Sequence, residues 1–366
     1  MDTKELFFKL LSFKSVTPDD DGALDFIEKY MSGFKALRID KNGVKNLFLY
    51  KKFGDQKHIC FAGHIDVVPP GDGWQSDPFV PVEKAGYIYA RGTQDMKSGV
   101  CAFLKACKEI GPDEFKGTLS VLLTSDEEGD AKYGTVEVLK ELKRKDFLPD
   151  YAVVAEPTCE KVFGDTIKIG RRGSINGKLE IYGKQGHAAY PKKATNPINL
   201  IASILPKIAG VNLDEGDENF EPSQFVITDI RAGMEVTNVT PNDLKMMFNI
   251  RNSTQTSVNL VEHFIKEKFR GLPYKLQINQ SSKPFVTNKN SEIVKAISKS
   301  IKNVLDINAS LSTSGGTSDA RFFGEYKIDT VEFGVKNDTI HSVNERTTLK
   351  EVKGLCSVFK NLIKEI

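Results

Sequence analysis

Apolar and polar residues follow two different patterns along the chain, and the change between them divides it into two parts. In the first part, short apolar runs typical of buried strands, such as residues 58–63 and 119–124, alternate with segments whose apolar residues recur every three or four positions. Residues 98–109 and 135–145 are such helical segments, and residues 151–155 form another strand. Alternating strands and helices predict an α/β domain with a mostly parallel mixed sheet and helices on both faces.

After residue 172 the pattern changes to strands that alternate between apolar and polar positions. The expected elements are a strand at 175–182, a helix at 197–209, strands at 224–230 and 245–250, a helix at 258–269 and a strand at 274–278. This β-α-β-β-α-β order is that of a ferredoxin-like α+β domain. The α/β pattern then resumes with a helix at 291–305, a strand at 330–333 and a helix at 349–363. We therefore predict a catalytic domain of residues 1–172 and 285–366 with an inserted domain of residues 173–284.

Composition and charge narrow the class of protein. Of the 366 residues, 40% are hydrophobic and 27% are charged, and the net charge is only +2, which gives no case for a nucleic-acid or membrane surface. No apolar run reaches the roughly 20 residues that cross a bilayer. Residues 1–11 have the pattern of an amphipathic helix and not of a signal peptide. The five cysteines are scattered, which favours reduced core thiols and a cytoplasmic location.

An acidic turn ends the predicted strand at 119–124. Asp126, Glu127 and Glu128 stand side by side, so they repel one another, and burial would raise their pKa values unless a cation compensated them. A solvated turn is one interpretation. The other is a ligand site, since open α/β sheets bind ligands beyond the carboxyl ends of their strands. Asp126 is the member that we expect to be solvated.

Further candidate ligands follow the other predicted strands or precede a helix. These residues are His64, Asp66, Asp95, Glu156 and His341. Each has an ordinary alternative, and Asp95 could equally be the N-cap of the helix at 98–109. Several gaps between them are near 30 residues, about one strand–helix unit, so the side chains should reach the same edge of the sheet. Their joint placement predicts a metal site, in which Asp66 could orient the His64 imidazole.

Histidine and carboxylate ligands without cysteine suit zinc in an open hydrolytic site, with cobalt or manganese as substitutes. The candidates are too many for one catalytic zinc. They suit two ions that share one bridging carboxylate and one water, and this leaves a carboxylate that can act as the base.

Several motifs resemble those of the di-zinc aminoacylase/deacylase metallopeptidases. They lie at residues 61–69, 91–99, 124–129, 170–174, 186–190, 315–322 and 339–341, so the resemblance runs through nearly the whole chain. It implies hydrolysis of a linear amide C–N bond. The chain departs from the family pattern at Thr93-Gln94, where small residues are commoner, and at Ile65, where threonine is frequent. Neither departure replaces a candidate ligand.

The resemblance implies a role for each matching residue. His64, Asp95 and Glu156 would hold one zinc, and Asp95, Glu128 and His341 the other. Glu127 would be the general base for the bridging water, and Asp66 would orient His64. The inserted domain would form a homodimer in which His187 reaches the partner's site and stabilises the oxyanion. A cis peptide bond would follow Asp95.

The substrate is less constrained than the chemistry. An acyl group that carries its own carboxylate needs a cationic pocket, and Arg171 and Arg172 could clamp it, although a solvated arginine pair is an equal alternative. The resemblance favours Arg171, with Ser174, Tyr190, Asn238, Thr317 and Asn337 as polar neighbours. Other activities on the same metal ions are alternatives to the cleavage of such a substrate: those of an acetylornithine deacetylase, or of a related dipeptidase or carboxypeptidase. A further alternative is a non-catalytic binding protein of the same fold.

Overall fold

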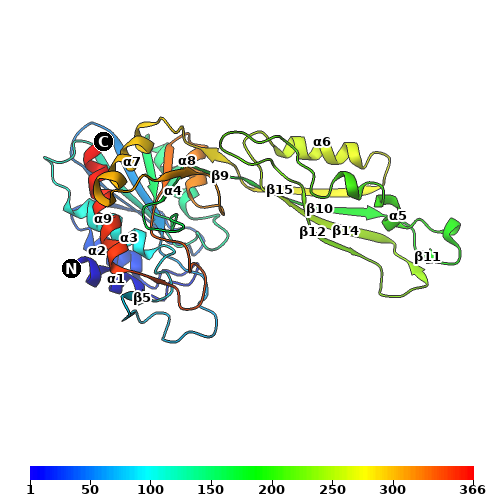
Figure 1. Cartoon of the computed structure of the whole chain (residues 1–366), viewed down its shortest axis with the longest axis horizontal. Helices are drawn as coiled ribbons and strands as arrows, with labels where there is room; N and C mark the ends of the chain where they lie inside the picture. The colour runs from blue at the N-terminus through cyan, green and yellow to red at the C-terminus, as the bar shows by residue number, and fades with distance from the viewer. The chain divides into compact units, whose positions relative to one another are not determined.

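The computed structural model describes residues 1–366 and contains two compact units (Figure 1). Unit 1 consists of Met1–Gly170, Val286–Ser312 and Ser318–Ile366, and unit 2 consists of Arg171–Phe285 and Thr313–Thr317. The sequence pattern placed the segment Thr313–Thr317 in the catalytic domain. It is grouped with unit 2 because its residues contact that unit, for example through a hydrogen bond between the hydroxyls of Thr317 and Ser282.

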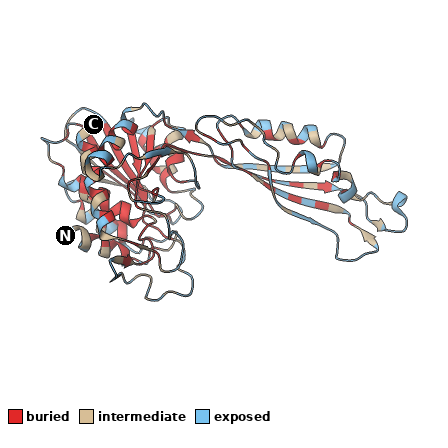
Figure 2. Ribbon diagram, viewed as in Figure 1, coloured by how far each residue is buried: buried red, intermediate tan, exposed pale blue.

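Unit 1 is built on an eight-stranded mixed sheet of order β1-β2-β6-β3-β7-β18-β8-β17. The strands are β1 Lys35–Arg38, β2 Asn46–Lys52, β3 His58–His64, β6 Thr118–Thr124, β7 Tyr151–Val154, β8 Thr166–Lys168, β17 Ser310–Ser312 and β18 Asp329–Glu332. The four central strands β6, β3, β7 and β18 run parallel to one another. Every residue of β3, β6 and β7 is buried, as expected for parallel strands covered on both faces. In Figure 2 the strands inside unit 1 are largely red, the colour of buried residues.

Helices cover both faces of this sheet. They are α1 Thr3–Leu11, α2 Ala23–Tyr30, α3 Lys97–Glu109, α4 Thr135–Arg144, α7 Glu292–Leu305, α8 Ala320–Glu325 and α9 Leu349–Glu365. Phe61 of β3 packs against Phe103 of α3 and Phe359 of α9. Successive strand residues point to opposite faces, and on the other face Phe48 of β2 packs against Phe147, which follows α4. The predicted fold class is therefore confirmed for this unit.

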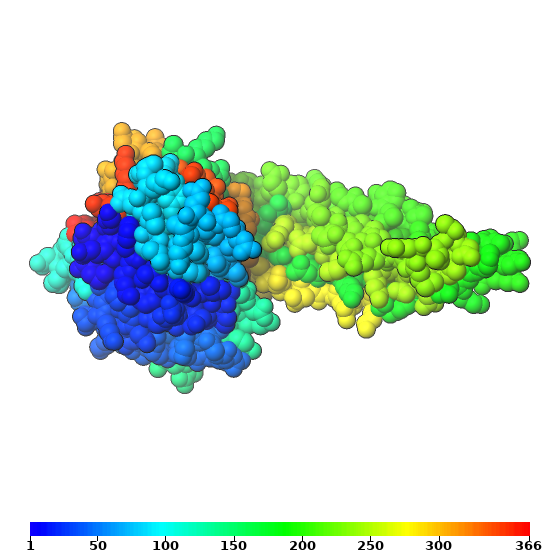
Figure 3. Space-filling model, turned by 90° about the horizontal axis from the view of Figure 1, so that it is seen from below, coloured from blue at the N-terminus to red at the C-terminus, as the bar shows by residue number.

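Unit 1 also contains a separate small sheet of three strands. It joins β4 Val82–Lys84, β5 Tyr87–Tyr89 and β19 Arg346–Thr347, in the order β19-β5-β4. The segment that carries β4 and β5, light blue in Figure 3, lies on the surface of unit 1 next to the dark blue N-terminal segment, where Lys4 and Glu83 form an ion pair. β19 follows the loop that carries His341, so this sheet joins the chain before α3 to the chain before α9.

Unit 2 has the predicted ferredoxin-like topology. Its elements are β10 Ser174–Tyr182, β11 Gly186–His187, α5 Pro197–Ile201, β12 Val226–Ala232, β13 Val239–Thr240, β14 Asp243–Ile250, α6 Val258–Lys268 and β15 Tyr274–Ser282. The main sheet is antiparallel, in the order β12-β14-β10-β15. β10 and β14 alternate between buried and more exposed residues, and Phe225 stacks on Phe248 in the buried layer at 4.5 Å between ring centroids. The short strands β9 Gly170–Arg171 and β16 Phe285–Val286 lie where the chain passes between the units.

The predicted helix at 197–209 is wrong in length. α5 ends at Ile201, and after a turn the chain forms a 3-10 helix at Leu205–Lys207, of the same length as the one at Pro191–Lys193. Pro206 has no N–H to continue an α-helix and its ring clashes with the preceding turn, which explains the interruption. No helix of either unit combines the length and the apolar character needed to cross a bilayer.

Candidate active site

The register of the parallel strands brings the predicted ligands of unit 1 to one edge of the sheet. His64, the last residue of β3, lies opposite Thr124, the last residue of β6, and Ala62 lies opposite Val154, the last residue of β7. The acidic turn after β6 and Glu156 after β7 therefore leave the sheet at the same edge as His64. This is the convergence that the spacing of these residues predicts.

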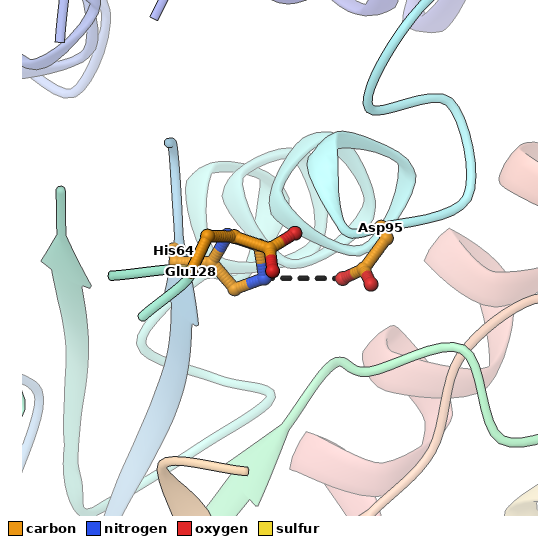
Figure 4. Close-up of side chains that lie close together, drawn as sticks. All are labelled: His64, Asp95 and Glu128. Atoms are coloured by element: carbon orange, nitrogen blue, oxygen red, sulfur yellow. Dashed lines mark hydrogen bonds and ion pairs between the residues drawn. The ribbon is translucent and has the colours of Figure 1, made fainter. Parts of the chain in front are cut away.

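Asp95 lies at the centre of the cluster. Its Oδ1 atom is 3.1 Å from His64 Nε2, and its Oδ2 atom is 3.2 Å from His341 Nε2. Figure 4 shows the first of these contacts, with Glu128 beside it. One carboxylate thus faces a different imidazole with each oxygen, which is the arrangement that a carboxylate bridging two metal ions requires.

The remaining carboxylates divide between the two histidines. Glu128 Oε1 is 3.0 Å from His341 Nε2, whereas Glu156 Oε1 is 3.9 Å and Glu127 Oε2 is 4.0 Å from His64 Nε2. Ligand atoms of His64, Asp95 and Glu128 all lie within 4.8 Å of one another. The structure therefore contains two groups of potential ligands that share Asp95.

Hydrogen bonds fix the orientation of His64. Its Nδ1 atom is 2.8 Å from the main-chain oxygen of Asp66, so Nδ1 carries a proton and Nε2 faces Asp95. The orienting contact comes from the main chain, because the Asp66 carboxylate is farther away, at 3.6 Å. That carboxylate instead accepts the N–H of Glu128 at 3.1 Å, and so Asp66 holds both a candidate ligand and the acidic turn.

The electrostatics of the cluster favour bound positive charge. Burial raises the pKa values of Glu127 and Glu156 well above the usual range, and neighbouring carboxylates add to the effect. Burial disfavours the charged form of His64, but its hydrogen bond to Asp95 and the nearby carboxylates raise its pKa well above the usual value. Hydrogen bonds to Asp95 and Glu128 raise the pKa of His341 to about 10. The site thus retains protons near neutral pH, and divalent cations would displace them.

These residues fit a metal centre in their chemistry as well. The donors are imidazole nitrogens and carboxylate oxygens without a thiolate, a set that suits zinc and accepts cobalt or manganese. Glu156 Oε1 is buried with no hydrogen-bond partner, as a carboxylate oxygen directed at a cation would be. His341 is the most accessible of the candidate ligands, with 49% of its side chain exposed, so the cluster opens to solvent on that side.

Two alternatives from the sequence are settled by the structure. Asp95 is not a helix N-cap, because that position is Met96 and no side chain caps α3. The Asp95–Met96 peptide bond is cis, as the resemblance implies. The expectation that Asp126 is solvated is wrong: it is only 4% exposed, and its carboxylate accepts the N–H groups of Lys132 and Tyr133. Asp126 is buried because it closes the turn that follows the acidic run.

Most of the predicted substrate-binding residues lie in unit 2. Arg171 is buried, and its Nη1 donates to the main-chain oxygen of Ser314 at 3.0 Å. Ser174 is also buried and accepts a hydrogen bond from Asn249. Gly315 has a positive φ, and a Cβ there would lie 2.6 Å from the Arg171 guanidinium, so this turn requires glycine beside the arginine. Tyr190 and Asn238 are exposed on unit 2, and Thr317 is bonded to Ser282, while Asn337 lies in unit 1.

His187 is exposed on β11 of unit 2, where it pairs with Val239. Its Nδ1 atom accepts the N–H of Ala189 at 3.1 Å. The neutral ring therefore carries its proton on Nε2, which can donate a hydrogen bond. This is the tautomer that an oxyanion donor needs, and the role itself stays a prediction.

The sequence did not reveal two buried residues that surround the Asp95 loop, Arg91 and Glu345. Glu345 accepts the N–H of Asp95 at 3.1 Å and forms an ion pair with Arg91 at 2.8 Å. No apolar periodicity marks them, because both lie in loops. The nearest signal was the position of Arg91 at the start of the motif at 91–99.

Comparison with known proteins agrees with this geometry. Residues 60–365 match the model of peptidase family M20/M25/M40. The chain belongs to this family. It is 64% identical over 364 residues to the succinyl-diaminopimelate desuccinylase of a Nitratiruptor species, a match that covers 100% of both chains. It is 62% identical over 365 residues to the enzyme of that name from Nautilia profundicola, again over 100% of both.

Solved structures share the M20/M25/M40 fold at lower identity. A Staphylococcus aureus tripeptidase superposes with a TM-score of 0.80 at 24% identity, covering 99% of this chain and 97% of the other. A Bacillus cereus aminopeptidase superposes with a TM-score of 0.82 at 21% identity, covering 100% of this chain and 99% of the other. A dinuclear metal binding peptidase of the M20 family from Bacillus subtilis gives 0.75 at 14% identity, covering 99% and 96%. These likenesses confirm the predicted fold, and family membership confirms a metal-dependent hydrolase that acts on amide bonds.

Proposed function

We propose that this protein hydrolyses N-succinyl-LL-2,6-diaminopimelate to succinate and LL-2,6-diaminopimelate, a step of lysine and diaminopimelate biosynthesis. Two observations support the substrate. Relatives that match the whole chain at 61–64% identity carry the name succinyl-diaminopimelate desuccinylase. The chain also has a buried arginine, Arg171, next to a glycine turn, which suits a substrate with a free carboxylate.

Two zinc ions would be held by the two groups of ligands that share Asp95. His64 and Glu156 would complete one site, and Glu128 and His341 the other, while cobalt or manganese could replace zinc. When bound, such ions polarise an amide carbonyl and lower the pKa of a water molecule at the site. The contacts of Asp95 with both imidazoles, at 3.1 and 3.2 Å, are the observation that carries this part of the proposal.

Glu127 would move the protons. Its carboxylate is largely buried beside His64, and its raised pKa suits a group that accepts a proton from water and then releases it. The water oxygen forms a bond to the amide carbon, and the C–N bond then breaks. The proton held by Glu127 passes to the leaving amine, so succinate and the free amine are the products.

His187 would donate a hydrogen bond from Nε2 to the oxyanion that forms at the amide carbon. We propose that it does so in the partner subunit of a homodimer formed through unit 2. A mixture of two inactive variants tests this, His187→Ala and Glu127→Gln. If His187 acts across the interface, a heterodimer contains one site with both residues intact, so mixing should restore activity to part of the population. No gain on mixing would contradict the exchange.

Arg171 would bind the succinyl carboxylate, with Ser174, Tyr190, Asn238, Thr317 and Asn337 as polar neighbours. Arg172 is a matched control, because its Nη2 donates to the main-chain oxygen of Pro222 at 2.7 Å and so serves the fold of unit 2. Arg171→Ala should raise KM for the succinylated substrate by about 10-fold or more, since a bidentate charged contact is lost. Arg172→Ala should change KM much less. Equal effects of the two variants would argue against the clamp.

The main alternative is acetylornithine deacetylation on the same metal ions. Side-by-side assays of the zinc-loaded protein with succinyl-diaminopimelate and acetylornithine decide between them. We expect kcat/KM to favour the succinylated substrate, because only its acyl group carries a carboxylate for Arg171. Preference for acetylornithine would refute the substrate assignment, and zero bound zinc would favour a non-catalytic binding protein. A biosynthetic role of this kind would be carried out in the cytoplasm.

A further inference from the structure

A buried carboxylate holds the loop that carries Asp95. Glu345 is fully buried and follows His341 by one short turn. Its Oε1 accepts the N–H of Gln94 at 2.7 Å and the N–H of Asp95 at 3.1 Å. Its Oε2 accepts the N–H of Gly92 at 2.9 Å and pairs with Arg91 Nη1 at 2.8 Å. One side chain from the His341 loop therefore fixes the main chain of the Asp95 loop at Gly92, Gln94 and Asp95.

The guanidinium of Arg91 extends this contact to other loops. It is 2% exposed and donates from Nη1 to the main-chain oxygen of Ser342 at 3.2 Å. Its Nη2 donates to Pro70 O at 3.1 Å and to His341 O at 3.4 Å. The segment that contains Pro70 follows Asp66, so three loops that carry candidate ligands meet at this one group. The ring of Trp74 lies 5.2 Å from the guanidinium carbon.

The side chain of Gln94 adds another connection between the Asp95 and His341 loops. Its Nε2 donates to Asp338 Oδ1 at 2.7 Å, and its Oε1 accepts the N–H of Thr339 at 2.8 Å and its hydroxyl at 2.9 Å. Gln94 stands where the family pattern usually has a small residue. The departure from that pattern therefore strengthens the same connection, and does more than change the packing.

From these contacts we infer that Glu345 and Arg91 are positioning residues, which hold Asp95 and His341 at the separation at which both can bind one metal ion. This role rests on the proposed metal centre. Neither residue needs to touch the substrate. A buried ion pair often adds little net stability, because desolvation offsets the attraction. Here the pair bonds to the N–H of the bridging ligand itself and to the main-chain oxygen of the second ligand, so its loss should change metal binding in particular.

Glu345→Gln tests the inference. The amide keeps the shape of the side chain but turns an NH2 group toward N–H donors, so part of the contact with the Asp95 loop is lost. Titration with Co2+, followed by visible absorption, should show two bound ions in the wild type. In the variant, one ion should bind about 10–100-fold more weakly and its absorption band should shift, since orienting partners of metal ligands have effects of that size. Glu351→Gln is the matched control: this buried carboxylate accepts the Thr347 hydroxyl at 2.7 Å and should leave both ions unchanged.

Wild-type Co2+ affinities and spectra in Glu345→Gln would overturn the positioning role. If that variant does not fold, Arg91→Lys serves in its place, because it keeps the charge beside Glu345 but cannot reach Pro70 and His341 with the same planar fork. This variant should lower the affinity for one Co2+ ion to a similar extent, and unchanged Co2+ binding would again overturn the inference. A wild type that binds no Co2+ would refute the metal centre and the positioning role together. If the wild type binds two Co2+ ions and the variants bind both with unchanged affinity, the positioning role alone is refuted.

Discussion

His341 Nε2 lies 3.2 Å from Asp95 Oδ2, although Asp95 precedes α3 and His341 follows the last strand of the main sheet. The contact depends on the loop after β18, in which His341 itself has a positive φ of 57°. The second group of candidate ligands is therefore completed by the C-terminal part of the chain, whereas His64 and Glu156 both come from the first half.

His341→Ala should lower the bound zinc from two ions to one per subunit. The first group of ligands is intact in this variant, because His64, Asp95 and Glu156 do not depend on the His341 side chain. Elemental analysis after dialysis measures the change. His263→Ala, which removes an exposed histidine of α6, should keep two ions. Retention of both ions by His341→Ala would mean that this histidine is not a ligand.

Glu127→Gln and Glu128→Gln should separate the base from its neighbour. Glu127→Gln should lower kcat by about 10²- to 10⁴-fold while two zinc ions remain bound, because an amide cannot accept the proton. Glu128→Gln should instead weaken zinc binding, since Glu128 Oε1 is in contact with His341. Parallel measurements of kcat and zinc content distinguish the two effects. Loss of zinc from Glu127→Gln would show that it is a ligand and not the base.

His58 lies at the opposite end of β3 from His64 and should make the free energy of unfolding depend on pH. Burial lowers its pKa to about 4, and its Nε2 atom lies 2.7 Å from Ser120 Oγ. In the unfolded chain the pKa is about 6.5, so between pH 6.5 and 4 the unfolded state binds more protons and stability falls with decreasing pH. The full effect is about 3 kcal/mol. Above pH 6.5 this source of pH dependence is absent.

Urea unfolding of the metal-free protein at pH 7.5 and pH 4.5 measures the effect, with His58→Asn as the comparison. The titration of the candidate metal ligands contributes equally to both proteins, so it cancels when the change in free energy of unfolding of the variant is subtracted from that of the wild type. The wild type should lose more free energy of unfolding between the two pH values than the variant. Equal losses would mean that His58 is not buried in its neutral form.

Gly99→Ala should destabilise unit 1 by about 1–3 kcal/mol, because it overpacks the contact between α3 and the residue that follows β7. A Cβ at Gly99 would lie 2.3 Å from the main-chain oxygen of Ala155, next to Glu156. We also expect weaker zinc binding, since α3 and Glu156 would have to separate. Chemical denaturation and zinc content measure both effects. Gly33→Ala, where a Cβ meets nothing within 4 Å, should change stability by less than about 0.5 kcal/mol.

The sequence predicted the parts of the fold that depend on repeated patterns. The buried runs of β3 and β6 and the helical period of α3 were found at nearly their observed bounds, because burial selects apolar residues over several turns or strand pairs. The helix at 197–209 failed at Pro206, a single residue that outweighed the apolar period around it. Four strands of the main sheet were missed: β1, β2, β8 and β17. β1 and β17 are short edge strands, and β8 has only three residues, so they carry little pattern. β2 is longer and lies inside the sheet, but its apolar residues run into Lys51 and Lys52 without a clear strand pattern.

The convergence of the candidate ligands was predictable for a different reason. His64, Glu128 and Glu156 are polar residues at or shortly after the ends of buried strands, where the chain has no need of them for packing. Asp126 and Glu345 could not be assigned in the same way. Each is buried through bonds to main-chain N–H groups of a loop, and the partners of such bonds depend on the loop conformation, which leaves no period in the sequence.

The division of unit 1 into separate stretches has a consequence during synthesis on the ribosome. His64, Asp95 and Glu156 are complete when less than half of the chain exists, but His341 appears only near its end. At ordinary elongation rates, roughly 10 to 40 s pass between the emergence of Glu156 and that of His341. The two groups of candidate ligands are therefore completed in a fixed order, and for most of synthesis a nascent chain contains only the group of His64, Asp95 and Glu156.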